Sequence, residues 1–103
     1  MAFINGPVPE LVERLVTATP AQFERDLRAA WPAVTGSSAQ GSLQLEHNDG
    51  QRLRIDLEVL PVRRLGLFVL PQLRAVYRFD GDEETARRRW LEILDRAMQK
   101  GGG

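Results

Sequence analysis

The spacing of apolar residues changes along the chain, from a helical period to a strand period and back. Near the N-terminus four apolar residues recur at spacings of one, three and four: Leu11, Val12, Leu15 and Val16. This spacing predicts a short amphipathic helix. A second helix is predicted next, since Thr19, Pro20 and Gln22 match an N-cap, a first-turn proline and a capping box. Pro32 ends that helix, so we expect a helical hairpin here.

Apolar and polar residues then alternate over 42–46 and 52–59, which predicts two half-buried strands. The register of this pair follows from placing apolar residues opposite one another. Leu45 then lies opposite Leu53, across a three-residue loop in which Gly50 takes the left-handed conformation. We expect an antiparallel hairpin at this point of the chain.

Three further segments complete the middle of the chain. Small polar residues from Val34 to Ser42 predict a flexible connection. A final strand is predicted from Leu73 to Phe79, starting after Pro71. Between the strand over 52–59 and this final strand, the apolar run from Leu65 to Leu70 predicts a third strand that is buried on both faces.

The end of the chain has the signals of a long helix, with Asp82 as N-cap and Gly101 as C-terminal stop. Its predicted inward stripe contains Ala86, Trp90, Leu91, Ile93, Leu94, Ala97 and Met98. The expected fold is an α+β two-layer sandwich: an N-terminal helical hairpin, an antiparallel three- to four-stranded meander and a long C-terminal helix packed on one sheet face. We expect one domain over residues 1–100 and a flexible glycine tail over 101–103.

Composition excludes several kinds of chemistry. The chain has no cysteine, which removes disulfides, thiolate metal ligands and cysteine nucleophiles. Its one histidine, His47, continues the strand alternation and fits a partly buried strand end. We therefore expect no catalytic, cofactor-binding or metal-binding residues, and a protein that is not an enzyme.

Charge and hydropathy limit the kinds of partner that we expect. The 14 basic and 14 acidic residues cancel, so nucleic acid is not the expected partner. The longest apolar run has six residues, far short of the roughly 20 that cross a membrane. The start of the chain lacks a signal-peptide pattern. Nearly all basic residues of the whole chain are arginine, and GC-rich genomes favour arginine codons. These features predict a bacterial, cytoplasmic protein.

The segment from Arg63 to Leu70 is the main candidate for function. If it is an inner strand its apolar residues are core, whereas at an edge or in a loop they form a patch for a partner. The candidate partner surface contains Arg52, Arg54, Arg63, Arg64, Phe68, Arg74 and Arg78.

We expect a non-enzymatic protein-interaction or accessory domain that binds a protein partner or a second copy of itself. The alternative is a domain that holds a small apolar ligand in a pocket between the sheet and the C-terminal helix.

Overall fold

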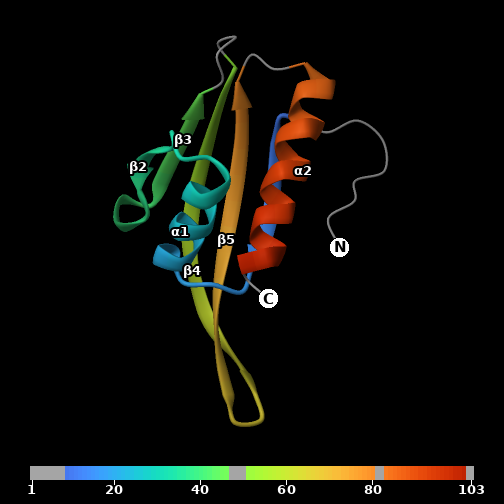
Figure 1. Cartoon of the computed structure of the whole chain (residues 1–103). Coiled ribbons are helices and arrows are strands. Elements are labelled where there is room, and N and C mark those ends of the chain that lie inside the picture. Colours follow the sequence, from blue (N-terminus) through green and yellow to red (C-terminus); the bar gives the residue numbers. More distant parts are fainter. Residues whose placement is uncertain (1–8, 47–50, 81–82, 102–103) are drawn as a thin grey trace.

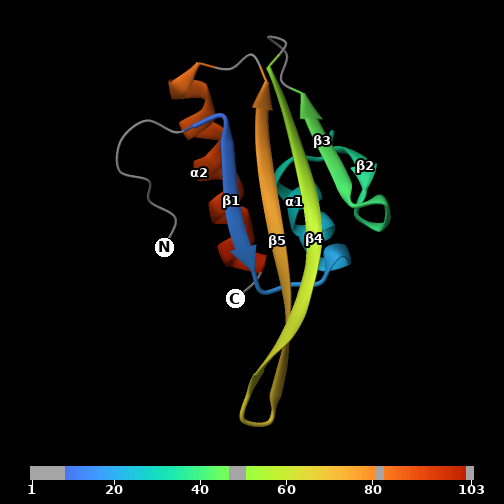
Figure 2. The ribbon, with the colours of Figure 1, turned by 180° about the vertical axis from the view of Figure 1, so that it is seen from behind.

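The computed structural model describes residues 9–46, 51–80 and 83–101. They form a five-stranded antiparallel sheet and two helices that cover one of its faces, in front of the sheet in Figure 1 and behind it in Figure 2. The strand order is β1-β5-β4-β3-β2. The elements are β1 (Leu11–Val16), α1 (Pro20–Ala30), β2 (Thr35–Ser37), the 3-10 helix η1 (Ser38–Gln40), β3 (Ser42–Glu46), β4 (Arg52–Leu65), β5 (Phe68–Asp80) and α2 (Glu84–Gly101). The α+β class with an antiparallel sheet is confirmed.

The first predicted helix is wrong, because this segment is the edge strand β1. It pairs with β5 along its whole length. Val12 and Val16 are buried under the helices, while Leu11 and Leu15 are exposed on the other face. Residues four positions apart share a face in a helix and in a strand alike, so the spacing suits both structures. The described residues therefore begin with a strand followed by a helix, and not with the predicted helical hairpin.

The predicted start of α1 is confirmed in detail. The Thr19 hydroxyl accepts a hydrogen bond from the Gln22 amide at 3.2 Å, and the Gln22 side chain accepts one from the Thr19 amide at 2.9 Å. Both halves of the capping box are thus formed. The helix ends at Ala30, two residues before Pro32.

The segment predicted as a flexible connection is also structured, as β2 and η1. Gly36 explains how β2 can lie against β3. Its φ is +90°, and a Cβ atom there would lie 2.5 Å from the Ser42 carbonyl oxygen. Only glycine fits such a close backbone approach, so this residue specifies the edge strand.

The register of β3 and β4 is confirmed, since Leu45 lies opposite Leu53. Three of the predicted features, the loop that ends at Gly50, the position of His47 and the N-cap Asp82, lie outside the described residues.

The predicted third strand from Leu65 to Leu70, buried on both faces, is wrong, because this segment contains the turn of one long hairpin. Its apolar side chains are largely exposed, as in the alternative of an edge or loop segment. β4 runs to Leu65 and β5 starts at Phe68, so Gly66 and Leu67 form a two-residue connection. Gly66 has a φ of +58°, whereas Leu67 has a negative φ, as in a type II′ turn. The last strand thus begins before Pro71 and includes it.

The core lies between the sheet and the two helices. From α2 it receives Trp90, Leu91, Leu94 and Met98, while Ile93 of the predicted stripe is 36% exposed. The rings of Trp31 and Trp90 meet with centroids 4.8 Å apart, which joins the end of α1 to α2. No helix among the described residues is long and apolar enough to cross a membrane.

Tyr77 lies at the centre of this core and is fully buried. Within the described part of the chain its hydroxyl group has no hydrogen-bond partner. Burial raises the pKa of the Tyr77 hydroxyl, and the nearby Asp95 carboxylate raises it further. Arg14 of β1 holds that carboxylate through Nε–Oδ1 and Nη2–Oδ2 contacts of 3.1 and 3.2 Å.

The capping box should contribute measurably to stability. We expect Thr19→Ala to lower the free energy of unfolding by about 1 kcal/mol. The Gln22 amide loses its acceptor, and the bond from the amide of residue 19 to the Gln22 side chain is no longer held in place by the reciprocal bond. Urea unfolding monitored by circular dichroism measures this. The control is Gln40→Ala, at an exposed site in η1, which should change the free energy of unfolding little. Equal stability of Thr19→Ala and wild type would contradict the prediction.

Removing the Tyr77 hydroxyl should not weaken the fold. Because that group is desolvated without a hydrogen bond, we expect Tyr77→Phe to leave stability unchanged or to raise it by about 1 kcal/mol. Tyr77→Leu, which changes the shape of the side chain, should destabilise the protein instead. Thermal and urea unfolding distinguish the two variants, and a clear loss of stability in Tyr77→Phe would show that the hydroxyl group does have a partner.

Candidate functional site

β4 and β5 continue together well beyond the rest of the sheet. β3 pairs with β4 only as far as Asp56, and β1 pairs with β5 only from Leu73 onward. The remaining two-stranded ribbon projects past both helices in Figures 1 and 2. We call residues 59–72 the arm, and the sheet face that the helices leave uncovered the open face.

The arm carries most of the exposed apolar groups. Of nine large apolar side chains exposed among the described residues, six belong to the arm, with exposed fractions from 47% to 100%: Val59, Val62, Leu65, Leu67, Phe68 and Val69. Leu67, at the turn, is fully exposed. A concentration of exposed apolar surface on one projection is typical of an interaction site.

Both faces of the arm are apolar. Residues directly opposite each other in the ladder share a face, and faces alternate along each strand. The register therefore places four apolar residues and one arginine on the side continuous with the open face: Leu60, Arg63, Leu65, Phe68 and Leu70. Val59, Arg64 and Val69 lie on the opposite side. Each face thus has apolar side chains and one guanidinium group.

A β-bulge lies midway along the arm. Between the pairs Leu60–Gln72 and Arg63–Leu70, β4 has two residues and β5 has one. Pro61 on β4 and Pro71 on β5 stand at this level. Proline cannot donate a backbone hydrogen bond, so each free edge of the ribbon is interrupted. The arm is therefore poorly suited to accept an added strand along either edge.

The other predicted arginines lie on the open face, and the carboxylates beside them neutralise most of their charge. Asp56 accepts hydrogen bonds from Arg54 Nε at 2.9 Å and from Arg78 Nε at 3.0 Å, and Glu58 accepts one from Arg74 Nη1 at 2.8 Å. Burial raises the pKa of Asp56, but the hydrogen bonds from the two arginines outweigh it and the net pKa is lowered. These arginines therefore do not form a strongly positive patch.

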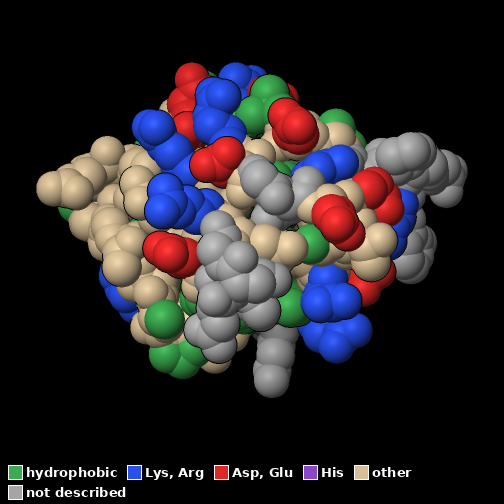
Figure 3. Space-filling model, turned by 90° about the horizontal axis from the view of Figure 1, so that it is seen from above, with side chains coloured by type: hydrophobic (Ala, Val, Ile, Leu, Met, Phe, Trp, Pro, Cys, Tyr) green, Lys and Arg blue, Asp and Glu red, His purple; other side chains and the backbone are tan. Residues whose placement is uncertain are grey.

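A hollow of about 660 Å³ lies at the end of the sheet away from the arm. Arg52 lies there, opposite Glu46 and Asp80 in the ladders, so the lining carries both signs of charge. Figure 3 shows basic and acidic side chains interspersed over this end of the molecule. The structure thus separates the predicted partner surface into two groups: Arg52, Arg54, Arg74 and Arg78 on the open face, and Arg63, Arg64 and Phe68 on the arm.

On the helix side, a cavity of about 60 Å³ lies beside Trp31 and Trp90. An apolar ligand of the predicted kind would need several times that volume.

Sequence reasoning missed four exposed apolar residues of the sheet outside the candidate segment Arg63 to Leu70: Leu11, Leu15, Val59 and Val62. One signal could have revealed the arm. Gly66 is equally far in sequence from Pro61 and Pro71, which suits a hairpin turn flanked by two interrupted edges. No comparable signal marks Leu11 and Leu15, because their exposure follows from the pairing of β1 with β5.

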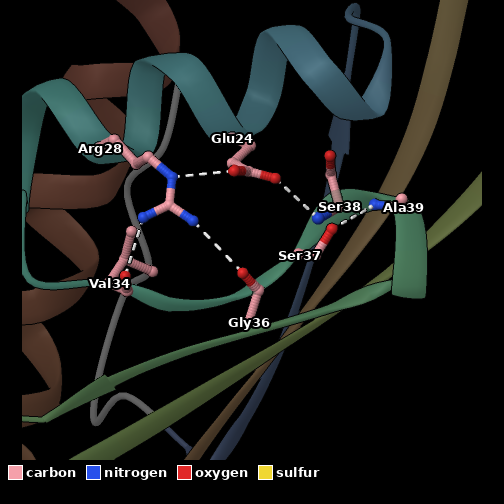
Figure 4. Close-up of polar contacts among 7 residues, drawn as sticks. All are labelled: Glu24, Arg28, Val34, Gly36, Ser37, Ser38 and Ala39. Atoms are coloured by element: carbon pink, nitrogen blue, oxygen red, sulfur yellow. Dashed lines mark hydrogen bonds and ion pairs between the residues drawn. The ribbon is translucent and has the colours of Figure 1, made fainter.

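A polar cluster fastens β2 and η1 to α1 (Figure 4). One oxygen of the Glu24 carboxylate accepts a hydrogen bond from the Ser38 amide at 2.7 Å, and the other accepts one from Arg28 Nε at 2.8 Å. Arg28 also donates to the carbonyl oxygens of Val34 and Gly36 at 2.9 and 3.3 Å. The bonds from Ser38 and Arg28 lower the pKa of Glu24 from 4.5 to about 2. The cluster is a structural link, since every polar group in it contacts the chain itself.

Comparisons with known proteins add no assignment to this geometry. No family model matches the chain, and no curated protein matches it either. Among the described residues, no group of three or more histidine, cysteine, aspartate and glutamate side chains is placed to hold a metal ion. The arm is the feature of the described residues that most needs a functional explanation.

The Glu24 cluster predicts a particular dependence of stability on pH. Because the pKa of Glu24 is lower in the folded protein than in the unfolded chain, its ionised form stabilises the fold above pH 4.5. This contribution is lost as the pH falls from 4.5 toward 2. We expect Glu24→Gln to be less stable at neutral pH and to lose less stability over that acid range. Urea unfolding at several pH values tests this against Glu92→Gln, a control at an exposed site on α2. Parallel pH profiles for wild type and Glu24→Gln would contradict it.

Proposed function

We propose that the protein is a non-enzymatic interaction domain, in which the arm is the docking element and the open face beside it holds a protein partner. The observation that carries this proposal is the projection of the arm beyond the sheet with six exposed large apolar side chains. A two-stranded hairpin by itself is marginally stable in water. A contact that covers the arm would both remove its apolar surface from water and hold it in place.

The open face supports a protein partner for the body of the domain. Leu11 and Leu15 are 48% and 72% exposed there, next to arginines that are already paired with carboxylates. Apolar groups surrounded by charge pairs of both signs resemble the centre and rim of a protein interface. A nucleic-acid surface would need unneutralised positive charge and exposed aromatic rings for stacking.

The alternative of a small apolar ligand between the sheet and the C-terminal helix stays a prediction. The buried side chains of Trp90, Leu91 and Leu94 occupy the space between α2 and the sheet. The cavity beside Trp90 adds only about 60 Å³. The observations favour a surface contact over an internal ligand.

Two surface variants should test this proposal. We expect Leu15→Asp, on the open face, to remove a protein that the wild type captures from cells of its source organism. Phe68→Asp should weaken the contact that the domain makes through the arm, while the fold of the domain is retained. Each variant places a charge in an apolar contact, where a loss of tenfold or more in affinity is typical. Quantitative capture after cross-linking, together with light scattering of the purified protein, measures partner and self-association.

The matched control is Ala21→Asp, which adds the same charge at an exposed position in the first turn of α1. A carboxylate is well tolerated at a helix N-terminus, so this variant should fold and bind like the wild type. If all three variants capture the same proteins and show the same mass as the wild type, the open face does not hold a protein partner and the proposal is wrong.

A further inference from the structure

The tip of the arm, residues 65–69, presents apolar side chains in every direction. Leu65 and Phe68 lie on one face, Val69 lies on the other, and Leu67 at the turn is fully exposed. A flat protein surface would cover only one of these faces. An environment that surrounds the tip is needed to remove all of this surface from water.

Arg63 and Arg64 stand directly behind the tip, one on each face of the ribbon. They are three and two residues from Gly66, which corresponds to roughly 7 to 10 Å at the rise of a strand. The two guanidinium groups therefore form a positive collar at one level around the base of the apolar tip.

The arm contains no acidic residue to neutralise this collar. No aspartate or glutamate occurs between Glu58 and Asp80 in the sequence. The arm thus carries a charge of about +2 although the whole chain is neutral. This local charge complements a surface that is negative, and the apolar tip beyond it complements a hydrocarbon interior.

From these observations we propose that the tip of the arm inserts into the interface of an anionic membrane, with Arg63 and Arg64 at the level of the lipid phosphates. The proposal rests on the docking role of the arm stated above, and it names the surface that the arm contacts. The open face on the body of the domain stays available for a protein partner.

The depth set by the collar agrees with the physics of interfacial binding. Peripheral segments bury their apolar groups by roughly 5 to 10 Å at the boundary of headgroups and acyl chains. At that depth the ribbon behind the tip stays among hydrated headgroups. Its free backbone N–H and C=O groups, which lipid could not satisfy, therefore keep water as a partner.

The edges of the arm favour a membrane over a protein strand as occupant. Pro61 and Pro71 interrupt both edges at the bulge, so an added strand would lose backbone hydrogen bonds there. A bilayer, by contrast, does not form backbone hydrogen bonds with the edges of a strand. It requires only apolar side chains on all sides and positive charge at one level, which are the two properties that the tip and the collar provide.

Vesicle sedimentation tests the proposal. We expect the full-length protein to bind vesicles of phosphatidylcholine mixed with phosphatidylglycerol more tightly than vesicles of phosphatidylcholine alone, and added salt should weaken the binding. Arg63→Gln and Arg64→Gln should each weaken binding to the anionic vesicles by about fivefold. Leu67→Asp should weaken it by about tenfold or more. Ala21→Asp should bind like the wild type, and circular dichroism should show that every variant is folded.

A fluorescent label reports insertion directly, because the chain has no cysteine and each variant carries one reactive thiol. An environment-sensitive dye on Leu67→Cys should shift to shorter wavelength with anionic vesicles and should be quenched by nitroxide-labelled lipids. The same dye on Ala21→Cys, in the helix layer, should do neither.

Three results would overturn the inference: no binding to anionic vesicles, binding that Leu67→Asp and the arginine variants leave unchanged, or a label at residue 67 that stays in water. If Phe68→Asp abolishes a protein contact while the wild type ignores vesicles, the tip binds protein, and the interaction function survives without the membrane. If changes in the arm alter neither binding to vesicles nor binding to proteins, the docking role of the arm is wrong as well.

Discussion

The pairing of β4 with β5 is the interaction on which the rest of the structure depends. It runs from Arg52–Asp80 at one end to Leu65–Phe68 at the other, interrupted by a single bulge. Within the body, the same two strands accept β3 on one side and β1 on the other, and they provide the apolar face on which both helices pack. Beyond the body they form the arm. One ladder therefore sets both the core and the element that we propose for docking.

The bulge decides which side chains the arm presents on each face. Before it, even-numbered residues of β4 such as Glu58 and Leu60 lie on the open face. After it, the extra residue moves odd-numbered positions to that face, so Arg63 and Leu65 join Leu60 there. Without the extra residue Arg64 would take the place of Arg63. A local irregularity thus controls the charge and apolar pattern over the whole outer half of the arm.

Features that depend on neighbouring residues could be predicted from the sequence. The capping box of Thr19 and Gln22 is such a case, and the register of Leu45 with Leu53 follows from a short hairpin. The arm was only partly predictable: Arg63, Arg64 and Phe68 were candidates, but an apolar run cannot show whether it is buried in a sheet or turns back on itself in water. The distribution of the two arginines over opposite faces, and the exposure of Leu67, required the turn at Gly66 and the ladder around it.

β1 shows a different consequence of the same architecture. Its residues near position 14 pair with residues near position 75, and Arg14 reaches Asp95 almost at the other end of the chain. During synthesis this strand has no partner until β5, about 60 residues further along the sequence, has left the ribosome. Its apolar spacing also suits a helix, so its final conformation is selected by β5 rather than by its own sequence. Closure of the sheet by the first strand is thus expected to be a late event in folding, and loss of the C-terminal third would leave the N-terminal segment without its partner.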